Sequence, residues 1–593
     1  MNDQPFSSEQ QEYLKGFMSG VEARRAALGL PATPAAPNTP ADAAPLADPS
    51  DLQRAAQDRT RAAGGKLVPQ EEAKRKKHPL DRFAEISAMA AAGKFAKGTD
   101  DFLIRFHGLF YVGPTQDAYM CRLRIPGGIL DTRQFRGVAD IADELGGGFT
   151  DCTTRANLQI RQIPAAAAPE IVLRLVELGL TSQGSGADNV RNVTGSPTAG
   201  IDAQELVDTR PHARAIHHHI LRSRELYGLP RKFNIAFDGG GRVPVLEETN
   251  DIAFTAVRVI EGFGVAPGTY YRLALGGITG HRDLARDTGV IVALDATTKV
   301  CDAILRVFIA HGDRTDRAKA RLKYLLDRWG IEKFLDAVEA ELGAPLPRID
   351  GAGILPRAEQ DKRGHIGVHR QIQPGLNYIG VLCPVGRLTT RRMRAIADIA
   401  DRHGSGTIRL TVWQNLLISD VADHDVAAVR AGIAAIGLAT EATQLEAGLV
   451  ACTGNAGCKF AAADTKSHAA RLAAWLDERI RVDAPVNIHL TGCHHSCAQH
   501  YIADIGLLGA KVERGDDLIE GYDLHVGGGA GLDQKIGRLI RPKVAYDDLP
   551  PMLLALLCAW TADRADTESF QSYTARLSNE ELHAITDRVL VEA

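Results

Sequence analysis

The chain contains a long internal repeat, and this repeat restricts the possible folds more than any other feature. Residues 124–160 align without a gap to residues 382–418, and just under half of the aligned positions are identical. Shorter matches continue the repeat: RNVTGS at Arg191 answers VACTGN at Val450, and LALGGITG at Leu273 answers LHVGGGAG at Leu524. Repetition over such a length indicates a duplicated α/β unit rather than a solenoid. We expect the two copies to pair about a pseudo-two-fold axis, with a ligand between them.

Each copy has the sequence pattern of a strand, a helix and a second strand. The ADIAD segments at 139–143 and 397–401 lie in helical patterns that end at glycine. The stretches CTTRANLQI (152–160) and IRLTVWQNLLI (408–418) follow, and each predicts one continuous strand. The fold class expected is therefore α+β, a mixed α/β fold with two related halves.

Length and charge exclude several classes of protein. A chain of 593 residues is too long for one hydrophobic core. Its formal net charge of -4 gives no overall field that would attract nucleic acid or an anionic membrane. The richest apolar run, Met552–Trp560, is shorter than the roughly eighteen residues of a membrane span and predicts a buried helix. Because no secretory signal is visible at the start, we expect a cytoplasmic protein.

The N-terminal region differs in composition from the rest. Residues 8–28 have helical spacing, and Pro31–Pro49 is an Ala/Pro/Asp-rich run with little to bury. The basic run Lys74–Lys77 is interpreted as a solvated surface, just before a globular part that starts near His78.

Four cysteines form two close pairs in the second copy. Five residues separate Cys452 from Cys458, and three separate Cys493 from Cys497. Thiolates are soft ligands suited to zinc or to iron-sulfur clusters. Zinc sites usually have two to four residues between paired cysteines, so the first pair favours a cluster. A zinc-stabilised binding protein remains an alternative.

These cysteine motifs, VACTGNAGCKFA and LTGCHHSCAQHYIADIGL, resemble those of the sirohaem-containing nitrite and sulfite reductases, from about residue 80 to the end. The resemblance implies that the four cysteines bind a [4Fe-4S] cluster, which Cys497 bridges to the sirohaem iron. It implies a duplicated nitrite/sulfite reductase fold with ferredoxin-like half-domains. We expect five segments: an extension with a helix and a disordered Ala/Pro linker (1–77), a ferredoxin-like half-domain (78–165), a sirohaem and substrate domain (166–345), a second half-domain (346–425), and a domain for the iron-sulfur cluster and sirohaem (426–593).

Basic residues that match the family pattern lie in the first copy. The resemblance implies that three of them bind the substrate anion: Arg122, Arg191 and Lys232. It implies that four others face the macrocycle: Thr153, Arg155, Gln159 and Arg231. In the second copy the partners of the three repeated arginines, Arg122, Arg155 and Arg191, are uncharged: Gly380, Trp413 and Val450. One family position differs, since Asp151 replaces an arginine of some sulfite-reducing members. Charge on one copy and cysteines on the other indicate a single site between them.

The resemblance implies a six-electron reduction of a small anion, and Lys232 is our candidate for passing protons. Sulfite-reducing members typically have K-x-K where this chain has Lys232 and Asn234, so Asn234 favours nitrite; sulfite reduction is the alternative. Retention of the three anion-binding positions argues against a related cobalamin-pathway oxygenase. No flavin or nicotinamide domain is evident, so we expect a ferredoxin as electron donor, with a flavoprotein subunit as alternative, and a monomeric enzyme.

Overall fold

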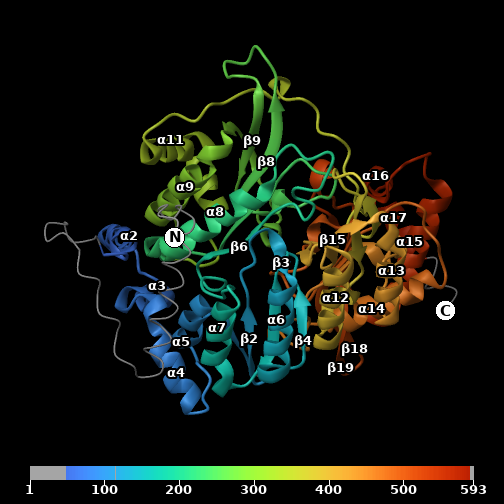
Figure 1. Ribbon diagram of the computed structural model, residues 1–593, viewed down its shortest axis with the longest axis horizontal. Helices are drawn as coiled ribbons and strands as arrows, with labels where there is room; N and C mark the ends of the chain where they lie inside the picture. Colours follow the sequence, from blue (N-terminus) through green and yellow to red (C-terminus); the bar gives the residue numbers. More distant parts are fainter. Residues whose placement is uncertain (1–47, 114, 588–593) are drawn as a thin grey trace, which may run out of the picture.

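A computed structural model describes residues 48–113 and 115–587 (Figure 1). The helix predicted at 8–28 and almost all of the Ala/Pro run lie outside these residues. The described strands form four five-stranded sheets, two for each copy of the repeat. The mixed α+β class is confirmed, since helices and sheets alternate along both copies.

In the first copy, one sheet has the order β1-β2-β5-β4-β13 and the other β10-β9-β8-β7-β6. The strands are β1 (Leu109–Val112), β2 (Ala118–Arg122), β3 (Ile129–Asp131), β4 (Phe149–Cys152), β5 (Leu158–Ile163), β6 (Val190–Thr194), β7 (Phe233–Asp238), β8 (Ile252–Val259), β9 (Gly268–Leu275) and β10 (Arg286–Val292). The helices are α4 (Phe83–Ala91), α5 (Thr99–Ile104), α6 (Thr132–Leu145), α7 (Ala168–Glu177), α8 (Thr209–Arg222), α9 (Thr297–His311), α10 (Leu322–Trp329) and α11 (Ile331–Leu342).

The second copy repeats this plan with sheets β11-β12-β15-β14-β3 and β16-β17-β18-β19-β20. Its strands are β11 (Gly367–Arg370), β12 (Leu376–Val381), β13 (Arg387–Thr389), β14 (Thr407–Leu410), β15 (Leu416–Ala422), β16 (Leu449–Ala451), β17 (Ile488–Thr491), β18 (Ile505–Arg514), β19 (Asp517–Val526) and β20 (Arg538–Ala545). Its helices are α12 (Thr390–His403), α13 (Val426–Ala435), α14 (Thr465–Asp477), α15 (Leu549–Asp563), α16 (Phe570–Arg576) and α17 (Asn579–Asp587).

The two copies exchange one short strand each. Strand β13 of the second copy pairs with β4 in the first sheet, with Arg387 opposite Asp151. Strand β3 of the first copy pairs with β14 in the third sheet, with Ile129 opposite Arg409. The exchange is reciprocal, as the pseudo-two-fold axis predicted from the repeat requires. It joins the half-domains into one structure with a shared apolar core.

Helices α6 and α12 lie side by side across the pseudo-axis and make equivalent ion pairs (Figure 1). Arg136 pairs with Asp398 at 2.7 Å, and Arg394 pairs with Asp140 at 2.8 Å. These groups are partly exposed, so each pair contributes little free energy. The buried residues under the helices, including Phe135 and Met393, supply most of the stabilisation.

The predicted continuous strands after α6 and α12 were wrong, because a tight turn divides each of them. In the first copy β4 ends at Cys152, the turn closes with Thr153 N–H donating to Asn157 O at 2.9 Å, and β5 follows. Ala156 adopts a positive φ of 45°, and Gln414 adopts 61° in the equivalent turn. Neither position is glycine, so these residues carry no turn signal. The turn matters because it carries Thr153 and Arg155.

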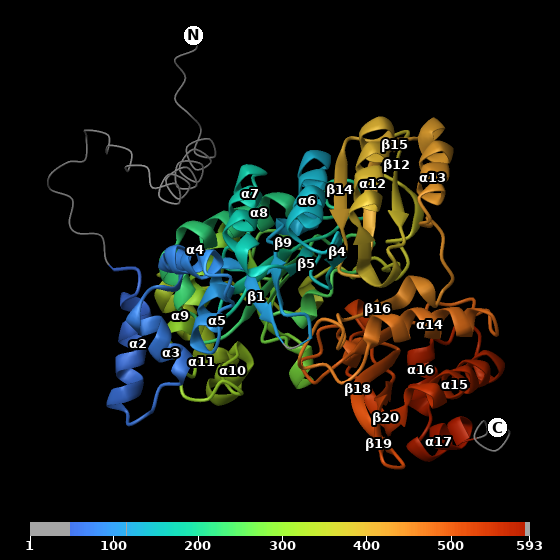
Figure 2. The same cartoon turned by 90° about the horizontal axis from the view of Figure 1, so that it is seen from below.

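The interpretation of Lys74–Lys77 as a solvated run was wrong for Lys74, whose side chain is fully buried. Helices α2 (Asp51–Ala62) and α3 (Pro69–Lys76) already precede His78, and they contact α9 and α5 respectively (Figure 2). Lys74 faces inward because its ammonium pairs with Glu71 one turn earlier on the same helix at 2.5 Å. Only Lys76 and Lys77 are exposed.

The predicted buried helix over Met552–Trp560 is confirmed within α15, where its apolar side chains join the core of the second copy. In residues 48–113 and 115–587, the longest apolar helices are too short to cross a bilayer. The glycines after β9 and β19 form turns at strand ends, with Gly276 at φ 91° and Gly527 at φ 75°.

Asp151 is a buried ion-pair centre between the copies. Its carboxylate accepts from Arg161 Nε at 2.8 Å and from Arg387 Nε at 2.9 Å, across the exchanged strand pair. Burial opposes its ionisation, but Lys466 and Arg161 outweigh burial and lower the pKa of Asp151 to about 2. The departure from the family pattern thus has a structural explanation at this position.

We predict that Asp151→Asn destabilises the protein by about 3 kcal/mol, because it leaves buried cations without their partner. Asp398→Asn, which removes an exposed partner, should cost less than about 1 kcal/mol. Thermal unfolding followed by circular dichroism checks both. Since the folded pKa of Asp151 lies below its unfolded value, its contribution is full above about pH 4 and is lost as the pH falls toward 2. Equal stability of the two variants at pH 7 would contradict the assignment.

Candidate functional site

The four predicted cluster cysteines lie in two loops that leave neighbouring parallel strands. Strand β16 ends at Ala451, opposite Leu490 of β17, so Cys452 and Cys493 start from the same edge of the sheet. The Gly492 N–H donates to Cys452 Sγ at 3.1 Å, and Cys452 N–H donates to Leu490 O at 3.0 Å. These bonds hold the two cysteine loops together.

Burial and the neighbouring thiols both raise the pKa values of cysteines in these loops. Burial, with smaller contributions from Cys497, Cys458 and Cys452, raises the pKa of Cys493 to about 12. Burial and Cys452 likewise raise the pKa of Cys497, against the effect of Lys232. Four thiolates at this place therefore need a cationic group among them to ionise.

The donor set of the four cysteines consists of soft thiolates, which suit an iron-sulfur cluster. A zinc site usually has two to four residues between paired cysteines, whereas five separate Cys452 from Cys458. The spacing therefore favours a cluster over the zinc-stabilised alternative.

The structure brings Arg122, Arg155, Arg191 and Lys232 together beside Cys497, and we call these four residues the basic cluster. Arg122 ends β2, and Arg155 lies in the β4–β5 turn. Arg191 on β6 and Lys232 before β7 are brought close by the parallel pairing of Val190 with Phe233. The pKa of Lys232 is well below its usual value because of burial and then Arg155, Arg321 and Arg191.

The basic cluster lies in the protein interior, but solvent still reaches it. Arg122, Arg155 and Lys232 are partly accessible and Cys497 is exposed. Yet burial is the main cause that lowers the pKa of Arg122 and of Arg155 to about 10. Side chains that solvent reaches but protein surrounds are typical of a deep binding site.

Neutral groups hold the guanidinium groups of the cluster in place. Arg191 donates to Ser185 O at 2.9 Å and to Ala187 O at 2.7 Å. Arg122 lies over the Phe110 ring, with its guanidinium carbon 4.6 Å from the ring centroid. In the described residues, the Lys232 ammonium has no hydrogen-bond or ion-pair partner. It is therefore free to bind an anion.

Arg155 is fixed by two amide side chains. Its Nη1 donates to Asn250 Oδ1 at 2.6 Å. In the side-chain orientation that satisfies its hydrogen bonds, Asn234 accepts from Arg155 Nη2 at 2.8 Å through its amide oxygen. Asn234 is thus buried next to the basic cluster, and its backbone N–H donates to Asp251 Oδ2 at 2.8 Å.

The other predicted cofactor-facing residues lie around the same place. Thr153 Oγ1 accepts from Arg155 N–H at 3.2 Å. Gln159 is directed to Arg161, whose Nη2 donates to Gln159 Oε1 at 2.5 Å. Arg231 donates from Nε to Arg317 O at 3.2 Å and has Nη1 3.9 Å from Asp188. Arg231 is therefore tethered at the margin of the basic cluster.

Three further residues that were not predicted as site residues support the site: Arg161 and Thr154 connect the two copies, and Arg321 acts within the first copy. Arg161 Nη2 donates to Thr453 Oγ1 at 2.5 Å, inside the first cysteine loop, and Arg161 Nη1 to Gly457 O at 3.3 Å. Thr154 Oγ1 donates to Cys497 O at 2.9 Å. Arg321 binds Asp251 at 2.6 Å and lies close enough to Lys232 to lower its pKa. Arg161 had a signal in the repeat, since its equivalent is the uncharged Ser419.

The equivalent place in the second copy is filled. Trp413, which replaces Arg155, is buried, stacks on His365 with ring centroids 5.6 Å apart, and donates from Nε1 to Pro244 O at 3.2 Å. A side chain at Gly380, which replaces Arg122, would meet His365 O at 2.3 Å. The pseudo-symmetric position thus has no room for a ligand where the first copy has one.

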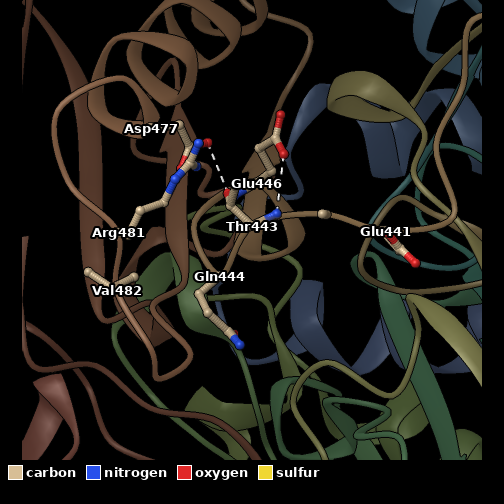
Figure 3. Close-up of a pocket in the computed structure, with 8 residues that line it drawn as sticks. Glu441, Thr443, Gln444, Glu446, Asp477, Arg481 and Val482 are labelled. Atoms are coloured by element: carbon tan, nitrogen blue, oxygen red, sulfur yellow. Dashed lines mark hydrogen bonds and ion pairs between the residues drawn. The ribbon is translucent and has the colours of Figure 1, made fainter.

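An open pocket of about 500 Å³ lies in the second copy, away from the cysteines (Figure 3). Glu441, Glu446, Asp477 and Arg481 line it, and Thr443 Oγ1 donates to Asp477 Oδ2 at 2.9 Å. None of the predicted site residues contributes to this pocket. It is therefore separate from the site formed by the cysteines and the basic cluster.

Comparison with known proteins agrees with this geometry. A family model described as the nitrite and sulphite reductase 4Fe-4S domain matches residues 186–346 and 447–587. A model of the nitrite/sulfite reductase ferredoxin-like half domain matches residues 111–178 and 369–436. Each model matches once in each copy, which confirms the duplication and the ferredoxin-like half-domains.

Individual proteins are similar over most of the chain. The ferredoxin–nitrite reductase of Synechococcus elongatus is 38% identical over 78% of this chain and 90% of its own. The chloroplastic ferredoxin–nitrite reductase of Zea mays is 34% identical over 83% of this chain and 89% of its own. The solved structure of the Mycobacterium tuberculosis NirA protein superposes with a TM-score of 0.80 at 32% identity, covering 87% of this chain and 97% of that protein. The chain belongs to the nitrite and sulphite reductase family.

Proposed function

We propose that this protein is a ferredoxin-dependent nitrite reductase that reduces nitrite to ammonia in the assimilation of nitrogen. The observation that carries the proposal is that the basic cluster and the thiol of Cys497 lie together although they come from different copies. The basic cluster of the first copy lies beside Cys497 of the second, so an anion bound to the cluster is next to the thiol centre. The similar proteins of Synechococcus elongatus and Zea mays are named ferredoxin–nitrite reductases, which supports the same activity here.

The residues present fit the two cofactors of the family. Cys452, Cys458, Cys493 and Cys497 would hold a [4Fe-4S] cluster, and Cys497 would also help to hold a sirohaem. The macrocycle carries carboxylates, and Arg155, Arg231, Thr153 and Gln159 lie at the same place to bind or face it. When bound, the two groups supply one-electron transfer to the anion.

The basic cluster supplies charge and protons. Arg122, Arg191 and Lys232 would offset the charge of the anion, and charge-assisted hydrogen bonds from them strengthen as negative charge develops on its oxygens. The carbonyl and aromatic partners of Arg191 and Arg122 fix the two guanidinium groups before substrate binds. Lys232, which has no partner in the described structure and a lowered pKa, is the residue proposed to donate protons to the departing oxygens.

Asn234 supports nitrite over sulfite. Its side chain is buried and neutral, and it accepts a hydrogen bond from Arg155. A lysine there would add a second ammonium beside Lys232, which favours a dianion more than a monoanion. Because the site has an amide instead, its charge suits the monoanion nitrite.

Electrons are proposed to come from reduced ferredoxin, as the names of the similar proteins indicate for those enzymes. The test is an anaerobic assay of the purified enzyme with reduced ferredoxin, and with reduced methyl viologen as a donor that needs no docking. Ammonium is measured with nitrite as substrate, and sulfide with sulfite. A higher specificity constant for sulfite would overturn the proposed substrate.

We predict that Cys452→Ser removes iron and the visible absorbance of the purified protein, because serine is a poor replacement for a soft thiolate ligand. The matched control is Cys558→Ser, which changes an exposed cysteine on α15 outside the cluster loops and should keep full iron content. Metal analysis checks both variants. Zinc instead of iron in the wild type would contradict the cluster assignment.

We predict that Lys232→Met lowers kcat for nitrite by about 10²–10⁴-fold, the usual contribution of a positioned proton donor. Iron content and absorbance should stay at the wild-type level, because no described residue depends on the ammonium for a hydrogen bond. Lys94→Met, at an exposed lysine, is the control and should leave kcat unchanged. Wild-type turnover in Lys232→Met would remove Lys232 from the mechanism.

We predict that Asn234→Lys shifts the ratio of specificity constants toward sulfite by about fivefold, since one more unit charge about 4 Å away attracts a dianion by an extra ~1 kcal/mol even in water. Asn234→Met is the matched variant, because it loses the bond to Arg155 without adding charge. It should lower both specificity constants and keep their ratio. A ratio that moves equally in both variants would show that Arg155, and not charge at position 234, sets the preference.

A further inference from the structure

Helix α3 places one lysine behind the basic cluster. The Lys74 side chain is fully buried, and its Nζ donates to Leu229 O at 2.7 Å. Leu229 lies three residues before Lys232, in the segment that leads into β7. The same Nζ is 3.6 Å from Asp188 Oδ2, three residues before Arg191 on β6. Lys74 therefore contacts both segments that supply the anion-binding residues, although it is not itself in the cluster.

Asp188 is the point where these contacts meet. Its carboxylate is fully buried and accepts from Arg317 Nη1 at 2.8 Å and from Nη2 at 2.7 Å. Arg231 Nη1 lies 3.9 Å away. Burial opposes the ionisation of Asp188, but Lys74 and Arg317 outweigh it and keep its pKa low. Three cations, Lys74, Arg317 and Arg231, therefore lie around the ionised carboxylate of Asp188.

Loss of Lys74 would change the balance around Asp188. The carboxylate would then face only Arg317 and Arg231, so Arg231 would be drawn closer to Asp188 and away from the basic cluster. The carbonyl of Leu229 would also lose a charged donor in a buried place, which loosens the Leu229–Lys232 segment. Both changes act on residues next to the substrate anion.

A second set of contacts anchors α3 against α2. Glu71 pairs with Lys74 at 2.5 Å and with Arg314 at 2.5 Å, so it is itself a partner of Lys74. Gln57 of α2 donates from Nε2 to Glu71 O at 3.0 Å and to Glu71 Oε2 at 2.9 Å, and accepts from Arg75 Nη1 at 3.3 Å. Among the described residues, these bonds of Gln57 hold α3 but do not involve Lys74, Asp188 or Leu229. A change at Gln57 therefore weakens docking of the helix and leaves the contacts of Lys74 with the site in place.

We propose that Lys74 is a positioning residue for anion binding, which holds Asp188 and the Leu229–Lys232 segment so that Lys232 faces the bound anion and Arg231 stays beside the basic cluster. The proposal rests on the function proposed above and assigns a role in it to the N-terminal segment. It predicts that loss of the Lys74 ammonium weakens nitrite binding by more than a loss of stability alone would explain.

The experiment compares Lys74→Met with Gln57→Leu and with Lys76→Met, an exposed lysine on the same helix. Nitrite affinity of the oxidised enzyme is measured by absorbance titration, and KM and kcat with methyl viologen. Lys74→Met should raise the Kd and KM for nitrite about tenfold, the effect of one charge-assisted hydrogen bond, and change kcat by less than about twofold. Gln57→Leu should lower the unfolding temperature but leave Kd and KM at wild-type values, and Lys76→Met should change nothing.

Hydrogen exchange gives a readout that does not depend on the substrate. Amides of residues 229–233 should exchange faster in Lys74→Met than in Gln57→Leu. If Lys74→Met does not accumulate as folded protein, Lys74→Gln, which keeps a donor for Leu229 O, serves in its place with the same direction of change. Wild-type Kd, KM and exchange in a folded Lys74 variant would overturn the proposal. A wild type that prefers sulfite would instead refute the proposed function, and the same comparison would then be made with sulfite.

Discussion

The exchange of strands β3 and β13 is the constraint on which the geometry of the site depends. Pairing of β13 with β4 fixes the end of β4, and therefore the turn that carries Thr153, Thr154 and Arg155. Thr154 then reaches Cys497 O from the other copy. The buried Asp151 stabilises the same strand pair through Arg161 and Arg387. A thiol from one copy and a guanidinium from the other meet because the two sheets are built from both copies.

Arrangement of charge in layers explains how several cations can gather in the interior. The groups that contact Arg122, Arg155 and Arg191 are carbonyl oxygens, an aromatic ring and amide oxygens, all of them neutral. The carboxylates of Asp188 and Asp251 lie one layer behind, where they pair with Arg317 and Arg321. Unpaired buried cations are unfavourable, and the lowered pKa values of Arg122 and Lys232 express this. A bound anion reduces the repulsion among these cations, and this gain in electrostatic free energy contributes to the affinity for the anion.

Much of this organisation could be predicted from sequence, because the repeat is long and the cysteine spacing is unusual. The family, the duplication, the α+β class and the cofactors followed from it, and the basic residues fell on the copy without the cysteines. The turn at Thr153–Ala156 could not be predicted, since a non-glycine residue takes the positive φ there and the bonds of Asn157 that support it are tertiary. Lys74 was misjudged for a similar reason. Its neighbours Arg75–Lys77 are charged, and two of its buried partners, Asp188 and Leu229, lie more than a hundred residues away, so local composition predicted a surface.

The filled pseudo-symmetric position shows why one site is enough for the doubled fold. Trp413 and the close approach of His365 to Gly380 occupy the place that Arg155 and Arg122 leave open in the first copy. Filling this place with apolar surface adds burial without any unpaired charge, and so stabilises the half that holds the thiols. The first copy has the opposite balance, with desolvated cations around open space. Because α6, α12 and the exchanged strands couple the halves around a shared apolar core, packing in the second copy also stabilises the half that holds the charged site.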